Sequence, residues 1–278
     1  MSVSSPGLPR RDRGAHSSGQ RAAGRRSAII LGSGRSGTSM VAGLFHGSGF
    51  FMGPDLLAAM EGNPRGLFES RPVNVLNEEL LAPAVALRPA NLVGKALHYR
   101  RLAPSQLWLA TPSPGAKIAE PDERQRRSME SWVANTPFAL KDPRFCYTLE
   151  AWRPLLEDCA YVCVFREPDR TADSILRECK GERYLRNLRM TYERALSIWS
   201  RMYEWILNVH SKSGEWTFVH YGQVADGSGI ERLEEVTGGE LDGSIVEPDL
   251  SRARARGSVP PAAGELYAEL CRRAGMAP

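Results

Sequence analysis

The sequence lacks any long apolar stretch, and its cysteines are few and scattered. No apolar run approaches the roughly 18–20 residues that are needed to cross a bilayer. The arginine-rich N-terminus lacks the apolar segment of about 7–15 residues that a secretion signal contains. The five cysteines form no paired CxxC motif, so they indicate reduced thiols in a core and no zinc site. From these absences we expect a cytoplasmic protein that does not insert into a membrane and holds no metal.

The body of the chain also lacks a large excess of charge of either sign. The net charge is +4, but residues 1–26 carry six arginines and one aspartate, a net +5, which leaves −1 for the rest. A nearly neutral body gives little support for nucleic-acid binding. We therefore expect residues 1–26 to form a disordered basic tail and residues 27–278 to form one folded catalytic domain.

Short, continuous apolar segments predict strands that are covered on both faces. They lie at 27–31, 137–140, 160–165 and 216–221. Alternating strands and helices predict an α/β fold of the P-loop type, with three layers and a central, mostly parallel sheet flanked by helices. Helical patterns are found at 38–46, 123–134, after Pro168, at 184–209 and at 265–274, whereas 47–120 indicates loops and short helices.

The first strand leads into a glycine-rich turn, Gly32-Ser-Gly-Arg-Ser-Gly-Thr-Ser39, and then a helix. Backbone N–H groups and a helix N-terminus converge on an anion in such a loop. The lysine that contacts the β- and γ-phosphates in nucleotide triphosphatases is replaced by Thr38. The remaining cation is Arg35, so the loop is suited to a phosphate but poorly equipped for a triphosphate.

Polar residues follow the other predicted strands as well. Lys141-Asp-Pro-Arg144, Arg166-Glu-Pro168 and His220-Tyr221 each stand at a strand end, where ligands bind in parallel sheets. Ser174 lies eight residues after Arg166, about one turn into the next helix. An arginine and a hydroxyl in this arrangement can bind one phosphate together.

A phosphate loop without its lysine, followed by a strand-end Arg and a Ser eight residues later, resembles the sulfotransferases that use 3′-phosphoadenosine-5′-phosphosulfate (PAPS). The resemblance covers roughly residues 27–260 and is closest to bacterial small-molecule sulfotransferases. Gly62-Asn-Pro-Arg-Gly-Leu-Phe-Glu69 and the Lys141–Arg144 segment resemble that branch. It implies a small-molecule acceptor, such as a natural product of secondary metabolism.

The resemblance also implies roles for individual residues. The strand-end Tyr221 would lie near the adenine, and arginines before Gly257, among them Arg254 and Arg256, would close over the 3′-phosphate. The glycine-rich form of that closing segment is missing here, so no single arginine is assigned. The 3′-phosphate would be bound by Arg166 and Ser174, and the 5′-phosphosulfate by Arg35, Ser36, Gly37, Thr38 and Ser39.

The implied chemistry is in-line transfer of a sulfuryl group from PAPS to a hydroxyl, less readily an amine, leaving 3′,5′-ADP. Arg35 and Lys141 would offset the developing charge. A base must take the acceptor's proton, but the position of the family's usual histidine holds proline. Glu69 is our first candidate for this base, and His98 and Asp142 are the alternatives.

Two other functions remain open at this stage. An ATP-dependent small-molecule kinase would need the missing loop lysine and a strand-end aspartate for Mg²⁺, for which Asp142 is the only tempting residue. A non-catalytic nucleotide-binding protein of the same fold would explain the missing histidine. The sequence predicts neither the identity of the acceptor nor the oligomeric state.

Overall fold

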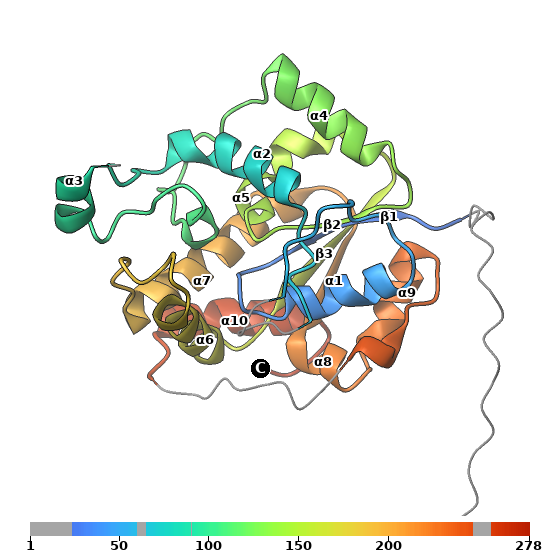
Figure 1. Ribbon diagram of the computed structural model, residues 1–278. Coiled ribbons are helices and arrows are strands. Elements are labelled where there is room, and N and C mark those ends of the chain that lie inside the picture. The colour runs from blue at the N-terminus through green and yellow to red at the C-terminus, as the bar shows by residue number, and fades with distance from the viewer. Residues whose placement is uncertain (1–23, 60–64, 90, 247–256) are drawn as a thin grey trace, which may run out of the picture.

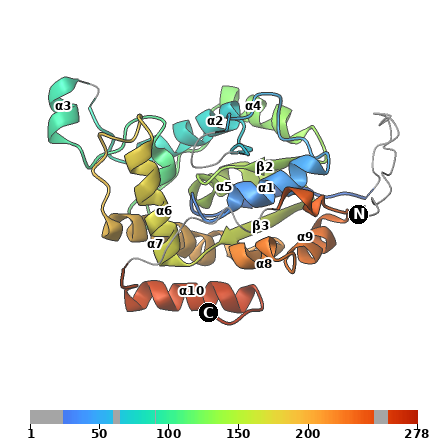
Figure 2. The ribbon, with the colours of Figure 1, turned by 60° about the horizontal axis from the view of Figure 1, so that its bottom comes forward.

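The computed structural model describes residues 24–59, 65–89, 91–246 and 257–278. At its centre is a four-stranded sheet in the order β2-β1-β3-β4, with every neighbouring pair parallel. Helices cover both faces of the sheet (Figures 1 and 2). The predicted α/β architecture is confirmed. The strands are β1 (Ser27–Leu31), β2 (Ala139–Lys141), β3 (Cys159–Phe165) and β4 (Trp216–His220).

The helices differ from the sequence prediction mainly in where they begin. The helix expected at 184–209 begins at Tyr192, because Thr191 caps it by accepting a hydrogen bond from the Arg194 amide (3.2 Å) and turns occupy 182–190. No helix was predicted at 145–152 or 230–237. The α-helices of the described residues are α1 (Thr38–Gly47), α2 (Arg71–Leu81), α3 (Leu92–Leu97), α4 (Glu123–Val133), α5 (Phe145–Trp152), α6 (Pro168–Gly181), α7 (Tyr192–Asn208), α8 (Tyr221–Ala225), α9 (Ile230–Thr237) and α10 (Pro261–Arg273).

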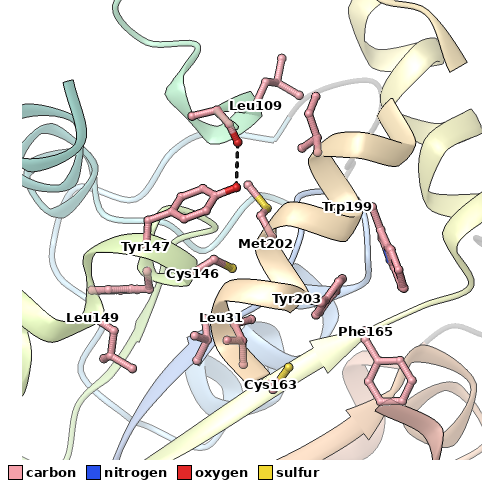
Figure 3. Close-up of a cluster of buried hydrophobic side chains, with 14 of the residues drawn as sticks. Leu31, Leu109, Cys146, Tyr147, Leu149, Cys163, Phe165, Trp199, Met202 and Tyr203 are labelled. Atoms are coloured by element: carbon pink, nitrogen blue, oxygen red, sulfur yellow. Dashed lines mark hydrogen bonds between the residues drawn. The ribbon is translucent and has the colours of Figure 1, made fainter. Parts of the chain in front are cut away.

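The sheet has a hydrophobic core on each face. Alternate residues of each strand point to opposite faces, so Ile30 and Val162 pack with α1 and α9. Leu31 and Cys163 pack on the other face, with α5 and α7 (Figure 3). Burial on both faces explains why the strands are continuous apolar runs without alternation.

The register of the sheet brings the four strand ends to one edge. Leu31 of β1 pairs with Cys163 of β3, and Ile30 pairs with Lys141, the last residue of β2. At the other side of the sheet, Phe165 pairs with His220, the last residue of β4. The residues that follow these strands therefore lie along one edge, which we call the strand-end edge.

The end of the predicted basic tail that joins the body packs against the fold. Arg25 donates to the backbone carbonyls of Ser48 (2.6 Å) and Glu240 (2.9 Å), and Arg26 donates to the Asp158 carboxylate (2.7 Å). Residues 1–23 of the tail lie outside the described residues. Within the part of the chain that the structure describes, no helix has both the length and the apolar character required to span a membrane.

Candidate functional site at the strand-end edge

The loop after β1 is built closely against its surroundings. Gly32 has φ +149°, and a Cβ there would lie 2.1 Å from the Val164 carbonyl oxygen. Gly37 has φ +94° and precedes α1, whose N-terminus has no side-chain cap. Glycine adopts such positive φ values without strain, and an uncapped helix N-terminus leaves backbone donors for an anion. The loop therefore has the construction of an anion cradle.

A buried tyrosine supports this loop from below. The Tyr203 hydroxyl, which comes from α7, donates to the Val164 carbonyl (2.8 Å) and accepts from the Ser33 amide (3.1 Å). It thus joins the end of β3 to the first turn of the loop from within the core that Figure 3 shows. Burial raises the pKa of this hydroxyl well above its usual value, so it stays protonated and able to donate.

Helix α6 binds the same loop from the side. Arg35 Nε donates to Ser174 Oγ (3.2 Å), and Arg35 NH1 lies 3.4 Å from a carboxylate oxygen of Glu178. The hydroxyls of Ser36 and Thr171 are 3.3 Å apart and share a hydrogen bond. Arg35 has φ +72°, which for a non-glycine residue costs about 1–2 kcal/mol. Its side chain and backbone are thus both held in a defined position.

Arg166 and Tyr221 lie together at the ends of β3 and β4. The Arg166 guanidinium carbon is 4.3 Å from the centre of the Tyr221 ring. The same ring packs against Gly37, and a Cβ on Gly37 would lie 2.5 Å from a carbon of the ring. Burial lowers the pKa of Arg166 from its ordinary value, against the opposing influence of Tyr221 and Glu167. Tyr221 therefore connects the strand-end arginine with the glycine loop.

Lys141 reaches the loop from β2. Its ammonium group donates to Ser39 Oγ (3.2 Å), to the Leu67 carbonyl (3.1 Å) and to the Glu69 carboxylate (2.5 Å). The second oxygen of Glu69 accepts from Asn74 (2.8 Å). Lys141 is 3% exposed and Glu69 is 6% exposed, so they form a buried ion pair beside the first turn of α1.

Asp142 is fully buried and faces a different set of partners. It accepts from the backbone and side chain of Arg144 (2.8 and 3.0 Å) and from Asn77 (2.9 Å). Burial raises the pKa of Asp142, and the nearby charge of Glu69 adds to this, while Arg144 and Asn77 oppose it. These contacts tie the β2 end to α2 and α5.

Of the remaining sequence candidates, His98 does not join this group. His98 follows α3, which lies at the periphery and away from the sheet in both views (Figures 1 and 2). Arg254 and Arg256 lie outside the described residues. The structure brings together Arg35 with Ser174, Lys141 with Glu69 and Ser39, and Arg166 with Tyr221.

The site also contains two aromatic residues that do not follow a strand. Trp108 lies against Gly34, with a ring carbon 2.6 Å from where a Cβ would be, and donates to the Tyr184 hydroxyl (3.2 Å). Partial burial, with the charges of Glu178 and Glu69, raises the pKa of Tyr184 to about 12, against the Trp108 hydrogen bond and Arg144. The sequence analysis missed Thr171 and Glu178, which contact the loop from α6. The signal that could have revealed them was their spacing with Ser174, which places all three residues on one face of a helix.

No protein-family model matches this sequence, and no curated protein does either. Among solved structures, the sulfotransferase domain from the curacin biosynthetic pathway superposes with a TM-score of 0.54 at 14% identity, over 88% of this chain and 97% of that one. The fold is shared with a sulfotransferase domain. A sulfotransferase domain from the Synechococcus PCC 7002 olefin synthase gives a TM-score of 0.49 at 16% identity, over 89% and 96% of the two chains. At these identities the likeness is one of fold.

Proposed function

We propose that this protein transfers a sulfuryl group from PAPS to a hydroxyl, less readily an amine, of a small molecule. The observation that carries the proposal is the hydrogen bond between Arg35 Nε and Ser174 Oγ (3.2 Å). It joins the loop expected to bind the 5′-phosphosulfate to the residue expected to bind the 3′-phosphate. Arg166, the other expected 3′-phosphate ligand, follows β3 on the same edge.

The residues at this edge suit a doubly phosphorylated donor. The glycine cradle and the uncapped α1 N-terminus favour an anion. Arg35 belongs to the loop and is held by Ser174 of α6, and Lys141 contacts the loop through Ser39. We assign Arg35, Ser36, Gly37, Thr38 and Ser39 to the phosphosulfate end, and Arg166, Ser174 and Tyr221 to the 3′-phosphoadenosine end.

When bound, PAPS would supply the activated sulfuryl group. The cations Arg35 and Lys141 would offset negative charge that develops during in-line transfer. Glu69 would take the proton from the acceptor hydroxyl, since its carboxylate lies beside Lys141 and the loop. Trp108, which lies against Gly34, and Tyr184, which is hydrogen-bonded to it, would form a wall beside the acceptor.

A ligand-binding measurement separates this proposal from a kinase. We expect 3′,5′-ADP to raise the melting temperature and ATP to have little effect, since the loop lacks its lysine. At about 100 Kd, a ligand of the folded state adds about 2.7 kcal/mol of stability. Stabilisation by ATP with Mg²⁺, and none by 3′,5′-ADP, would contradict the proposal.

Turnover must be tested separately, because a non-catalytic protein of this fold would also bind 3′,5′-ADP. Labelled PAPS supplied with a generic phenol should yield a labelled sulfate ester. Binding without transfer to any acceptor in a broad panel of phenols, alcohols and amines would favour the non-catalytic alternative.

A further inference from the structure

A cavity of about 400 Å³ lies beside the C-terminal half of α6, apart from the strand-end edge. A helix turns about 100° per residue, so Leu176 and Lys180 of the cavity lie on the opposite side of α6 from Ser174 and Glu178, and Cys179 lies between the two sides. The volume falls within the range of ordinary small-molecule sites. It is lined by Leu176, Cys179, Lys180, Arg186, Leu188, Arg189 and Met190.

The lining has two distinct parts. Cys179 and Leu188 are buried, and Leu176 and Met190 are half-buried, so they form an apolar floor. Lys180, Arg186 and Arg189 are exposed and form a cationic rim. A ligand that matches both parts must have an apolar body and a negative charge.

One further cation lies near the floor of this cavity. Arg194, in the first turn of α7, lies within electrostatic range of Cys179 of the floor and of Arg88 and Arg100. Its NH1 atom is buried and has no hydrogen-bond partner. Burial lowers the pKa of Arg194, and the like charges of Arg88 and Arg100 lower it further. An arginine in the first turn of a helix is also disfavoured by the helix dipole.

Within the part of the chain that the structure describes, carboxylates do not pair with these cations. Among the described residues, Lys180, Arg186, Arg189 and Arg194 form no ion pair with an Asp or Glu. Arg186 reaches only the Gly181 carbonyl (3.4 Å), and Arg189 stacks over Tyr99 (4.5 Å). The three cations of the rim attract an anion, and no ion pair among the described residues offsets that attraction.

We propose that this cavity binds a small amphipathic phosphate monoester, with its apolar chain on the floor and its phosphate between Lys180, Arg186 and Arg189 of the rim. A phosphate monoester is favoured over a carboxylate because it carries about −1.5 to −2 charges near neutral pH and three acceptor oxygens. Arginine and lysine bind such a group by charge-assisted hydrogen bonds. This site is separate from the proposed PAPS site and does not depend on it.

Calorimetric titration with hexyl phosphate tests the proposal. We expect saturable binding with one site per chain. Hexanol should bind at least tenfold more weakly, since it lacks the charge. Inorganic phosphate should also bind far more weakly, since each buried methylene adds up to about fourfold in affinity. Saturating 3′,5′-ADP should leave hexyl phosphate binding unchanged.

Variants locate the site. The double variant Lys180→Ala/Arg189→Ala should weaken hexyl phosphate binding about tenfold or more, and Met190→Gln should weaken it severalfold. Lys180 and Arg189 are exposed, so we expect the melting temperature of the double variant to stay near that of the parent. Lys212→Ala is the matched control, because Lys212 is an exposed cation beyond the C-terminal end of α7. The length of α7 places it about 25 Å from the N-terminal end of that helix.

Several results would overturn the proposal. They are the absence of saturable binding, equal binding of hexanol or inorganic phosphate, competition by 3′,5′-ADP, and unchanged affinity in the folded double variant. An equal loss of affinity in Lys212→Ala would likewise contradict it, because the effect would then come from net charge alone.

Discussion

Two groups of cations, one at the strand-end edge and one around the cavity, differ in whether a carboxylate pairs with them. At the strand-end edge, Lys141 pairs with Glu69 and Arg35 with Glu178. Around the cavity, Lys180, Arg186, Arg189 and Arg194 have no carboxylate partner among the described residues. Paired cations are fixed in position before any ligand arrives, which suits groups that must act on developing charge. Unpaired cations retain their full attraction for an incoming anion, which suits simple binding.

The two groups also differ in how much stability is lost when a cation is removed. A buried ion pair requires both partners, since removal of one leaves an uncompensated charge. An exposed cation can be removed with little loss of stability. Substitutions at the strand-end edge should therefore change stability, activity or both, whereas those at the cavity rim should change mainly ligand binding.

The largest effect is expected for Lys141→Ala. It leaves the Glu69 carboxylate buried without its cation, which typically costs about 3–5 kcal/mol of stability. It also removes a proposed catalytic charge, so turnover should fall by about a hundredfold or more. Denaturant unfolding and initial rates with labelled PAPS measure the two losses.

The double variant Lys141→Ala/Glu69→Gln is the matched control for that experiment. Without the buried carboxylate, most of the lost stability should return, but turnover should not. If Lys141→Ala unfolds no more easily than the parent, the pair is not held as tightly as its geometry indicates. Recovery of turnover in the double variant would remove Lys141 from the chemistry.

Arg166→Ala should produce the next largest effect, on ligand affinity. Loss of a charged donor to phosphate typically costs about 1.5–3 kcal/mol, so affinity for 3′,5′-ADP should fall about ten- to a hundredfold. Adenosine 5′-phosphate lacks the 3′-phosphate and should be affected much less. Titration of both ligands measures the difference. An equal loss for both would place Arg166 near another part of the donor.

Glu69→Gln should lower turnover at least about tenfold and leave 3′,5′-ADP binding nearly unchanged. Glutamine keeps the shape and can still accept from Lys141, but it cannot take the acceptor's proton. Asp142→Asn and His98→Ala should be measured beside it. Full turnover in Glu69→Gln, with loss in one of the other two, would move the role of base to that residue. Activity in all three would indicate an acceptor acidic enough to need no base.

The sequence was sufficient to predict the parts of this site that depend on local pattern. The glycine loop, Lys141, Arg166 and Tyr221 each follow a short apolar strand, and parallel strands must end at one edge. The pairing of Lys141 with Glu69 was not predictable, because the two residues are 72 positions apart and 47–120 has no regular pattern. The contact of Trp108 with Gly34 could not be predicted for the same reason.

Helix α6 contains one site residue that the sequence predicted and one that it did not. Ser174 was identified from its distance to Arg166, but Glu178 on the same face was overlooked, since one acidic residue near a helix end is usually solvated. Only the fold reveals that Glu178 faces Arg35. The start of α7 was placed eight residues too early, because Leu185 and Leu188 are buried from within turns and mimic a helical pattern.

The smallest effect concerns Glu167, at the rim of the strand-end edge. Burial acts to raise the pKa of Glu167, but contacts with His220, its own backbone and Arg170 lower it to about 2. A depressed carboxyl pKa adds stability that is complete above the ordinary value of about 4.3 and is lost as pH falls toward 2. Since the side chain is 30% exposed, solvent screening should reduce this contribution to about 1 kcal/mol.

Glu167→Gln should therefore be less stable than the parent at pH 6, and the difference in unfolding free energy should narrow steadily toward pH 3. Urea unfolding of both proteins at several pH values measures it. A gap that stays constant between pH 6 and pH 3 would mean that the charge of Glu167 contributes nothing to stability. Glu167 would then resemble the cations of the cavity, which are not stabilised by ion pairing.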